Sequence, residues 1–264
     1  MRDHMTQGDN VLAPNILRLG AVALPIFLGP VAWAEPVKTR PAVSQVARQE
    51  PWQVRKARFV RAERRYGVAD PSSAVRNQLS AEFISLLKTE GAYVLAGRSL
   101  PEEYTEYYAD LIGTVATLPE DAALDALLIP SVLDTGAMAT RGVAAFGQRA
   151  FPRLMGELAK RPNDSHVAFS MSLVFRDMLS GKVRQGNELD EASRARIREI
   201  AFENLDSEDV QLRALSITLI GRYDDPEATQ RVLTLANAGS ETPAVVRDAA
   251  RSVLEMRAPP SRHP

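Results

Sequence analysis

The sequence contains no cysteine and only three histidines among its 264 residues. Without cysteine there is no disulfide, no thiolate nucleophile, no cysteine-ligated zinc and no lipidated cysteine. The histidines are His4, His166 and His263, and no two of them have the spacing of a metal-binding motif. This scarcity argues against histidine-rich metal sites and against most histidine-based catalysis.

Motifs for nucleotide, calcium and acyl-transfer chemistry are also missing. The 15 glycines are scattered and form no glycine-rich phosphate loop. The acids near residues 206–209 and 224–227 lack the Asp-x-Asp-x-Asp-Gly spacing of a calcium loop, and no Gly-x-Ser-x-Gly elbow accompanies His166. We therefore expect no catalytic residue, no cofactor and no metal.

The overall charge is close to balanced, with 32 Lys plus Arg against 33 Asp plus Glu and a net charge of −1. A protein that binds nucleic acid through its whole surface is disfavoured by this balance. Hydrophobic residues make up 45% and charged residues 25% of the chain, which is typical of a globular protein and excludes wholesale disorder or a multi-span membrane protein.

The N-terminus has the pattern of an export signal. Arg18 precedes an apolar run over 19–28, and Ala32 and Ala34 then stand in the A-x-A arrangement that signal peptidase accepts. We expect a signal peptide over 1–34, cleaved after Ala34, and a periplasmic or secreted protein. The alternative is an uncleaved N-terminal anchor, although an apolar stretch with two prolines is short of the ~20 residues needed to cross a bilayer.

The segment 35–65 is basic and contains several prolines, and we interpret it as a linker or arm. It carries nine positive and three negative residues, whereas residues 66–264 have a net charge of −7. Arg58, Arg61 and Arg65 are its candidate partner-binding residues, for anionic lipid, polysaccharide or an acidic partner. The interpretation that we favour is a solvated helix or tail that docks loosely on the acidic body.

Residues 66–258 show one helical pattern after another, and no alternation typical of paired strands. Apolar residues recur at three- and four-residue spacing, and the breaks between these stretches carry capping residues. Caps are expected at Asp70-Pro71, at Ser99 with Glu102, at Asp206-Ser207, at Asp225-Pro226 and at Thr242-Pro243. The last helices are expected over 167–179, 190–205, 210–223, 227–238 and 244–256. The chain is thus expected to be all-α, with a disordered tail over 259–264.

The last third of the chain repeats itself. Residues 209–215 align with 243–249 at a shift of 34, which places Leu219 opposite Val253, and the preceding helices align at a shift of 35. A helix pair is therefore the repeating unit.

These residues resemble short HEAT-like repeats. The resemblance rests on the segments 209–215 and 242–250, with Arg213 and Arg247 near the start of their helices, and on the segment 139–154 with Arg141. The resemblance covers 105–257, although the period is shorter than the ~40 to 47 of longer repeats and the unit around 167–179 lacks the arginine. We favour HEAT-like repeats over tetratricopeptide repeats, because the Trp and Leu-Gly signature of the latter is missing. We also favour them over an irregular helical bundle.

The resemblance implies an α-solenoid of antiparallel helix pairs with a concave surface. Its structural repeat positions are Arg141, Arg213, Arg247, Leu215, Leu219 and Val253. The arginines are expected to reach carbonyl ends or an acidic turn, for example Asp209 or Asp248.

One further stretch, 102–110, combines acids with Tyr104, Tyr107 and Tyr108. The tyrosines are candidate partner-binding residues for a sugar or a peptide. The interpretation that we favour is structural: the acids interact with the helix macrodipole and the tyrosines pack on the neighbouring unit.

Our leading functional hypothesis is an exported helical-repeat scaffold, and not an enzyme, that binds a protein or peptide partner through its concave face. Two alternatives remain. The first is an envelope-associated module that docks lipid or polysaccharide through its basic arm. The second rests on fold resemblance alone, since some HEAT-like proteins are implicated in bilin lyase chemistry, and export argues against it.

Overall fold

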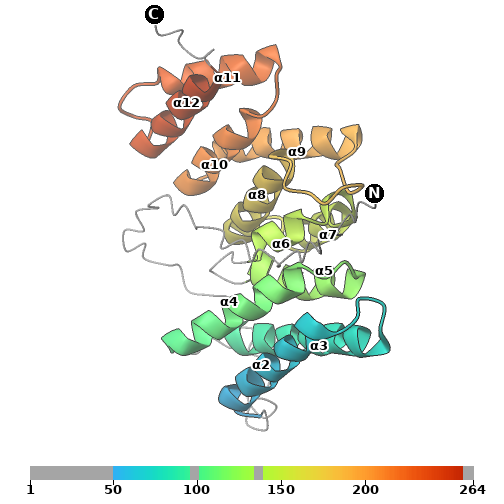
Figure 1. Ribbon diagram of the computed structural model, residues 1–264. Helices are drawn as coiled ribbons and strands as arrows, with labels where there is room; N and C mark the ends of the chain where they lie inside the picture. The colour runs from blue at the N-terminus through green and yellow to red at the C-terminus, as the bar shows by residue number, and fades with distance from the viewer. Residues whose placement is uncertain (1–49, 96–100, 134–138, 258–264) are drawn as a thin grey trace, which may run out of the picture. The chain divides into compact units, whose positions relative to one another are not determined.

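The computed structural model describes residues 50–95, 101–133 and 139–257 (Figure 1). All of them belong to one compact unit of the chain, residues 40–264. The expected signal peptide, the first part of the expected linker, Ser99 and the tail 259–264 lie outside the described residues. Within the described residues the chain is all-helical, without strands, which confirms the all-α class.

The described residues form eleven α-helices, and most begin close to where the sequence pattern predicts. Their bounds are α2 Trp52–Val68, α3 Ala74–Leu95, α4 Glu102–Ala116, α5 Asp121–Leu128, α6 Thr140–Ala144, α7 Phe151–Lys160, α8 Ser165–Leu179, α9 Glu191–Glu203, α10 Val210–Ile220, α11 Pro226–Ala236 and α12 Ala244–Arg257. A π-helical turn, Ile129–Leu133, follows α5. None of these helices is both long enough and apolar enough to cross a membrane.

The basic segment is a packed helix from Trp52 onward, so the interpretation of 35–65 as a linker or arm is wrong for residues 52–65. Helix α2 buries Arg55, Phe59 and Ala62, which recur at three- and four-residue spacing, and it packs on α3. The expected start of the body at residue 66 falls inside this helix. The many arginines hid the narrow packing face, because only two of its three residues are apolar.

Aspartate side chains cap four of the helices in the C-terminal half. Asp164 accepts hydrogen bonds from two backbone N–H groups of α8 and Asp209 from two of α10, while Asp190 accepts one from α9 and Asp225 one from α11. The cap predicted at Asp225 is confirmed. The cap predicted at Asp206-Ser207 is wrong, because the chain makes a 3₁₀ turn up to Asp206 and α10 begins only after Asp209.

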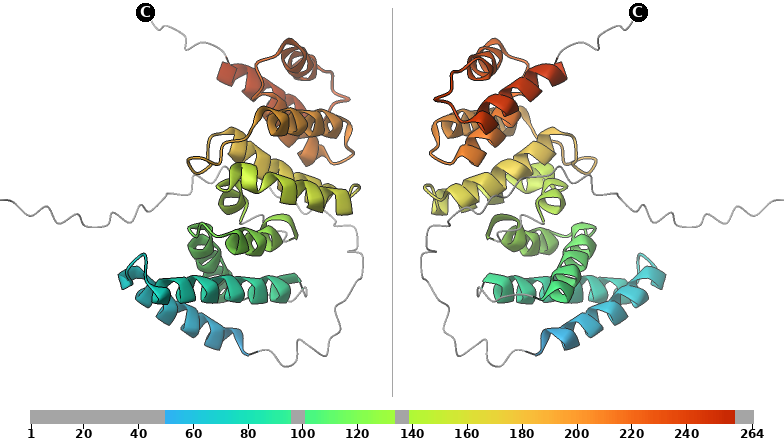
Figure 2. Two further views of the ribbon diagram at one scale, coloured as in Figure 1. Left: turned by 90° about the vertical axis from the view of Figure 1, so that its right-hand side faces the viewer. Right: turned by 90° about the vertical axis from the view of Figure 1, so that its left-hand side faces the viewer.

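The even-numbered helices contact one another in succession (Figures 1 and 2). Helix α4 packs on α6, α6 on α8, α8 on α10 and α10 on α12, and we call these five helices the even row. The odd-numbered helices pack mainly on their neighbours in sequence. Helix α11 begins 35 residues after α9, and α12 begins 34 residues after α10, which agrees with the repeat found in the sequence.

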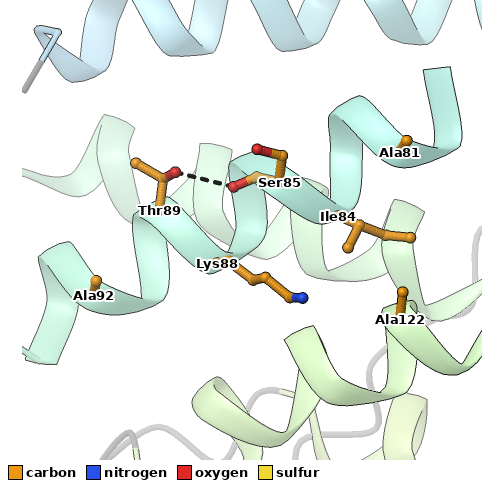
Figure 3. Close-up of a pocket in the computed structure, with 7 residues that line it drawn as sticks. All are labelled: Ala81, Ile84, Ser85, Lys88, Thr89, Ala92 and Ala122. Carbon is orange, nitrogen blue, oxygen red and sulfur yellow. Dashed lines mark hydrogen bonds between the residues drawn. The ribbon is translucent and has the colours of Figure 1, made fainter. Parts of the chain in front are cut away.

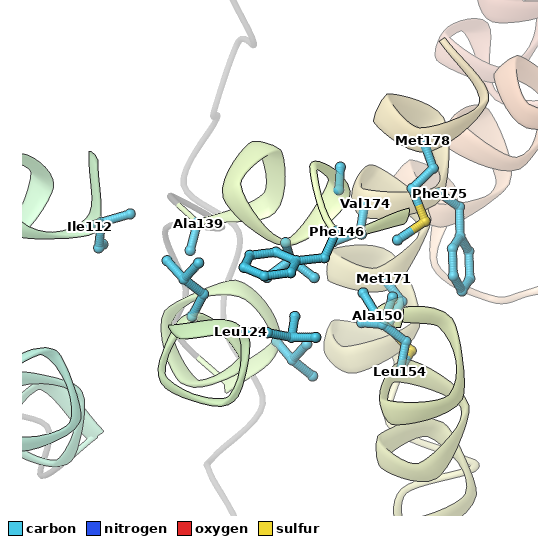
Figure 4. Close-up of a cluster of buried hydrophobic side chains, with 14 of the residues drawn as sticks. Ile112, Leu124, Ala139, Phe146, Ala150, Leu154, Met171, Val174, Phe175 and Met178 are labelled. Atoms are coloured by element: carbon cyan, nitrogen blue, oxygen red, sulfur yellow. The ribbon is translucent and has the colours of Figure 1, made fainter. Parts of the chain in front are cut away.

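One hydrophobic core extends from Phe59 in α2 to Val253 in α12. Figure 4 shows its middle part, where Phe146 lies between Leu124 of α5 and the residues of α8. The structure buries most of the residues that the helical pattern assigns to the core, namely Leu124, Val143, Phe146, Leu154, Leu212, Leu215, Leu219, Val232 and Val253. Leu128 and Leu235 are only partly buried.

The loop between α8 and α9 reaches back over the preceding elements. Arg184 in this loop donates hydrogen bonds to the carbonyls of Ala116 and Leu118 at the end of α4, and its guanidinium stacks 4.5 Å from the ring centre of Phe146. Gly147 has a φ of +49°, and a Cβ there would lie 1.8 Å from the carbonyl oxygen of Asn187. Only glycine therefore allows this loop to pass so closely.

Candidate functional site

A buried polar cluster joins the first three helices. We call it the Glu90 cluster, and it consists of Glu90, Arg55, Tyr104 and Tyr107. Arg55 donates from Nε to Glu90 Oε1 at 2.6 Å and from Nη2 to Oε2 at 2.7 Å. The hydroxyls of Tyr104 and Tyr107 donate to Oε2 at 3.1 Å and to Oε1 at 2.9 Å. Each carboxylate oxygen thus accepts two hydrogen bonds, one from the guanidinium and one from a tyrosine.

The electrostatics of the Glu90 cluster keep its donors protonated. The hydrogen bond to Glu90 raises the pKa of Arg55. Burial, and then the nearby Glu90 carboxylate, raise the pKa of Tyr104 and of Tyr107. All three donors therefore remain donors across the physiological pH range, which is what a fully buried carboxylate requires.

Aromatic rings enclose the Glu90 cluster. Trp52 contacts Tyr104 edge to face at 5.6 Å between ring centres, and Arg55 lies 5.5 Å from the ring centre of Tyr93. The cluster fixes α2 to α3 and α4, and it is packed rather than open to a substrate. We therefore assign it a structural role.

The predicted partner-binding role of Tyr104, Tyr107 and Tyr108 is wrong. Their exposed fractions are 0%, 1% and 2%, so no partner can touch them. The favoured alternative is confirmed: the tyrosines lie in the core, and Glu102 and Glu103 occupy the first turn of α4. Helical geometry explains the outcome, because the three tyrosines share a face with Leu111 at i+3, i+4 and i+7 spacing.

The three candidate arginines of α2 have different environments. Arg58 forms ion pairs with Glu50 and Glu82, both at 3.3 Å. Arg61 and Arg65 are exposed, and no ion pair joins either of them to a described residue. Arg61 and Arg65 are thus available to a partner, whereas Arg58 is already paired with carboxylates of the same chain.

The repeat arginines do not reach the two acids expected as their partners. Arg247 donates to the carbonyls of Gly239 and Thr242, in the loop before its own helix. Arg213 Nε is buried and makes no hydrogen bond within the described residues, and Arg141 is exposed. Asp209 is engaged as a helix cap and Asp248 pairs with Arg251, so the predicted links of Arg213 and Arg247 to these acids are wrong.

A different arginine links the two C-terminal helix pairs. Arg198 of α9 donates two hydrogen bonds to Asp225, at 3.0 and 3.1 Å, and one to Glu227 at 2.6 Å. These bonds raise the pKa of Arg198, and the bond from Arg198 is the main cause that lowers the pKa of Asp225. Because Asp225 also caps α11, the same carboxylate caps the helix and links the two helix pairs.

Two open hollows lie on the surface. One, of about 590 Å³, runs along α3 beside Ala122 and includes Ile84, Ser85 and Lys88 (Figure 3). The other, of about 620 Å³, lies near the end of α10 and is lined by Tyr223, Leu233 and Arg257 among others.

Among the described residues, no group of three or more His, Asp or Glu side chains is placed to hold a metal ion. Asp164, which precedes His166 by two residues, is engaged as the cap of α8.

The Glu90 cluster was missed by sequence reasoning, although a signal was present. Glu90 continues the buried stripe of Phe83, Leu86 and Leu87 on α3, and Arg55 shares a stripe with Phe59 on α2. Two opposite charges on two apolar stripes are the pattern of a buried ion pair, because a buried charge needs a partner.

None of the known protein families, curated proteins or solved structures compared with the chain matches it.

Proposed function

We propose that the chain is a HEAT-like α-solenoid that acts as a scaffold and binds a protein or peptide partner along the exposed side of the even row. The observation that carries the proposal is the succession of contacts from α4 to α12, together with helix pairs that recur at 34 and 35 residues. Stacked helix pairs bury a continuous core by touching their neighbours and display an extended surface.

The nature of the surface favours a macromolecule over a small molecule. A surface that crosses several helices contacts an extended chain at many points, whereas small ligands need a concave pocket that encloses most of their surface. The hollow along α3 and the hollow near the end of α10 are both open rather than enclosing.

Two glycines provide a matched test of this surface. Gly113 lies on α4, in the even row, and Gly156 lies on α7, outside it. Both are exposed, and a Cβ at either position would have no atom within 4 Å. Gly113→Arg and Gly156→Arg therefore add the same charge and bulk to a helix without disturbing packing.

The experiment is capture of partners from a cell-envelope extract by the full chain at low and high salt, with identification by mass spectrometry. We expect a protein partner that resists high salt and whose capture falls at least tenfold with Gly113→Arg, whereas Gly156→Arg captures as the wild type does. Equal capture by both variants would contradict the assignment of the surface. Capture of no protein at either salt concentration would contradict the scaffold function itself.

We further propose that the protein is exported by its N-terminal signal peptide. Support comes from the sequence alone, from the apolar run over 19–28 and the Ala32–Ala34 cleavage pattern. Mass spectrometry of the protein recovered from the envelope or medium is expected to show Glu35 as the first residue. A full-length chain in the membrane fraction would favour the anchor instead.

A further inference from the structure

Helix α2 has a second face that the fold does not use. We call it the outward face, and it consists of residues at three- and four-residue spacing that are all exposed: Val54, Ala57, Arg61, Arg64, Arg65 and Val68. It lies opposite the face on which Arg55, Phe59 and Ala62 are buried. At about 1.5 Å per residue, it is about 21 Å long.

The outward face is positively charged and its charges are not neutralised within the described residues. The ion pairs of α2 are those of Arg55 with Glu90 and of Arg58 with Glu50 and Glu82. No acid belongs to the outward face, and the single acid of the helix, Glu63, lies to one side of it. Elsewhere the surface arginines Arg149, Arg153, Arg196 and Arg198 pair with carboxylates. Arg141 and Arg222 are also exposed without an ion pair within the described residues, but they lie singly, whereas α2 places three such arginines on one face.

An apolar residue stands at each end of the outward face. Val54 is 45% exposed, and Val68, at 88%, is the most exposed large hydrophobic side chain of the described residues. Basic surfaces of proteins are attracted to anionic lipid headgroups, and exposed apolar side chains add to the binding when they enter the headgroup region. Arginine in particular binds phosphate through two parallel hydrogen bonds.

We propose that the outward face of α2 binds the surface of a lipid bilayer that contains anionic phospholipids. Arg61, Arg64 and Arg65 bind the phosphates, and the two valines enter the apolar edge of the headgroup region. Lipid fits better than a water-soluble polyanion such as a nucleic acid or a polysaccharide. The arginines would bind either kind of ligand, but only a bilayer offers the two exposed valines an apolar region to enter. This inference does not rest on the proposed scaffold function, since α2 packs on α3 and α4 and the outward face points away from that packing.

The test is co-sedimentation of the full chain with vesicles of phosphatidylcholine alone and of phosphatidylcholine with phosphatidylglycerol. We expect binding to the anionic vesicles only, weakening from 0.05 to 0.5 M salt as screening shortens the range of the charges. The variant Arg61→Gln/Arg64→Gln/Arg65→Gln is expected to bind on the order of a hundred-fold more weakly, since each arginine near an anionic surface adds about a factor of five.

The matched control is Arg141→Gln/Arg222→Gln/Arg251→Gln, which removes three exposed arginines from other helices and loops. It is expected to bind within about threefold of the wild type, because charge near the membrane and not net charge determines the attraction. Equal losses in the two triple variants would overturn the proposal. The apolar run over 19–28 is the same in every variant, and any binding that it causes appears with neutral vesicles as well.

The valines separate lipid from other polyanions. Val54→Ser/Val68→Ser is expected to weaken vesicle binding several-fold and to leave binding to heparin, a soluble polyanion, unchanged. If the valine variant binds vesicles as the wild type does, and heparin competes fully for the same arginines, the outward face is a general polyanion site and the lipid assignment is wrong. Circular dichroism melts of all variants establish that each is folded.

Discussion

The first three helices depend on a single buried carboxylate. Glu90 has no exposed surface, and it accepts four hydrogen bonds from Arg55, Tyr104 and Tyr107. A buried ion pair costs much of what it gains, because two charges lose their hydration, but removing one partner leaves the other charge uncompensated. The arrangement therefore specifies where α2 docks more than it adds to stability.

We predict that Glu90→Gln lowers the free energy of unfolding by about 3 to 5 kcal/mol, because Arg55 then has no counter-charge in the core. The double variant Arg55→Met/Glu90→Gln is expected to be more stable than Glu90→Gln alone, because no buried charge remains in it. The amide oxygen of the new glutamine side chain still accepts a hydrogen bond from a tyrosine. Urea unfolding of the wild type, both single variants and the double variant measures the coupling free energy between Arg55 and Glu90. Additive losses would show that the ion pair is not coupled.

Two glycines are predicted to respond to alanine with opposite signs. Gly147→Ala is expected to destabilise the protein by more than 1 kcal/mol, because its φ is positive and the methyl group meets the Asn187 carbonyl. Gly113→Ala lies within a helix in open space and is expected to stabilise by up to about 1 kcal/mol. Thermal melts of the two variants decide this. A stable Gly147→Ala protein would mean that the loop after α8 does not pass over Gly147 as described.

At the scale of elements, most helices could be predicted from the sequence and the start of the body could not. The last five helices follow from apolar periodicity and acidic or proline caps, and α9 to α12 fall within a few residues of their predicted bounds. Helix α2 was hidden because its packing face contains an arginine whose partner is 35 residues away. Arg184 was equally hidden, since its acceptors are backbone carbonyls 66 and 68 residues away, which no side-chain pattern reveals.

The link between α9 and α11 is predicted to respond to pH. Arg198 lowers the pKa of Asp225 below its ordinary value of 3.8, so the ionised carboxylate stabilises the folded state above that value. This contribution is lost as the pH falls through the lowered pKa. We expect Arg198→Met to be about 1 kcal/mol less stable than the wild type at pH 7, and the difference to shrink below about pH 4.

The control is Arg196→Met, which removes an exposed arginine of the same helix whose partners are Glu199 and Glu203. Its stability is expected to change by less than that of Arg198→Met, because exposed pairs contribute little. Urea unfolding at pH 7, 5, 4 and 3 measures all three proteins. A difference between wild type and Arg198→Met that is the same at every pH would exclude Asp225 as its source.

At the scale of the whole molecule, the central claim is that helix pairs stack one on the next. The sequence supplied the period of 34 to 35 residues, and the structure supplies the contacts of the even row. In such a stack the stability of each pair depends on its neighbours. A local defect therefore destabilises the adjacent pairs most, and its effect on stability decreases with distance along the chain. A bundle with one cooperative core would instead lose stability everywhere at once.

The most direct test is hydrogen exchange of the Leu219→Ala variant, followed by mass spectrometry. Leu219 is fully buried in α10, and its truncation is expected to cost about 2 to 5 kcal/mol. Our account predicts faster exchange in α10, α11 and α12, with α3 and α4 protected as in the wild type. Equal loss of protection in α3, α4 and α12 would contradict a stack of helix pairs and would make the protein a single cooperative bundle.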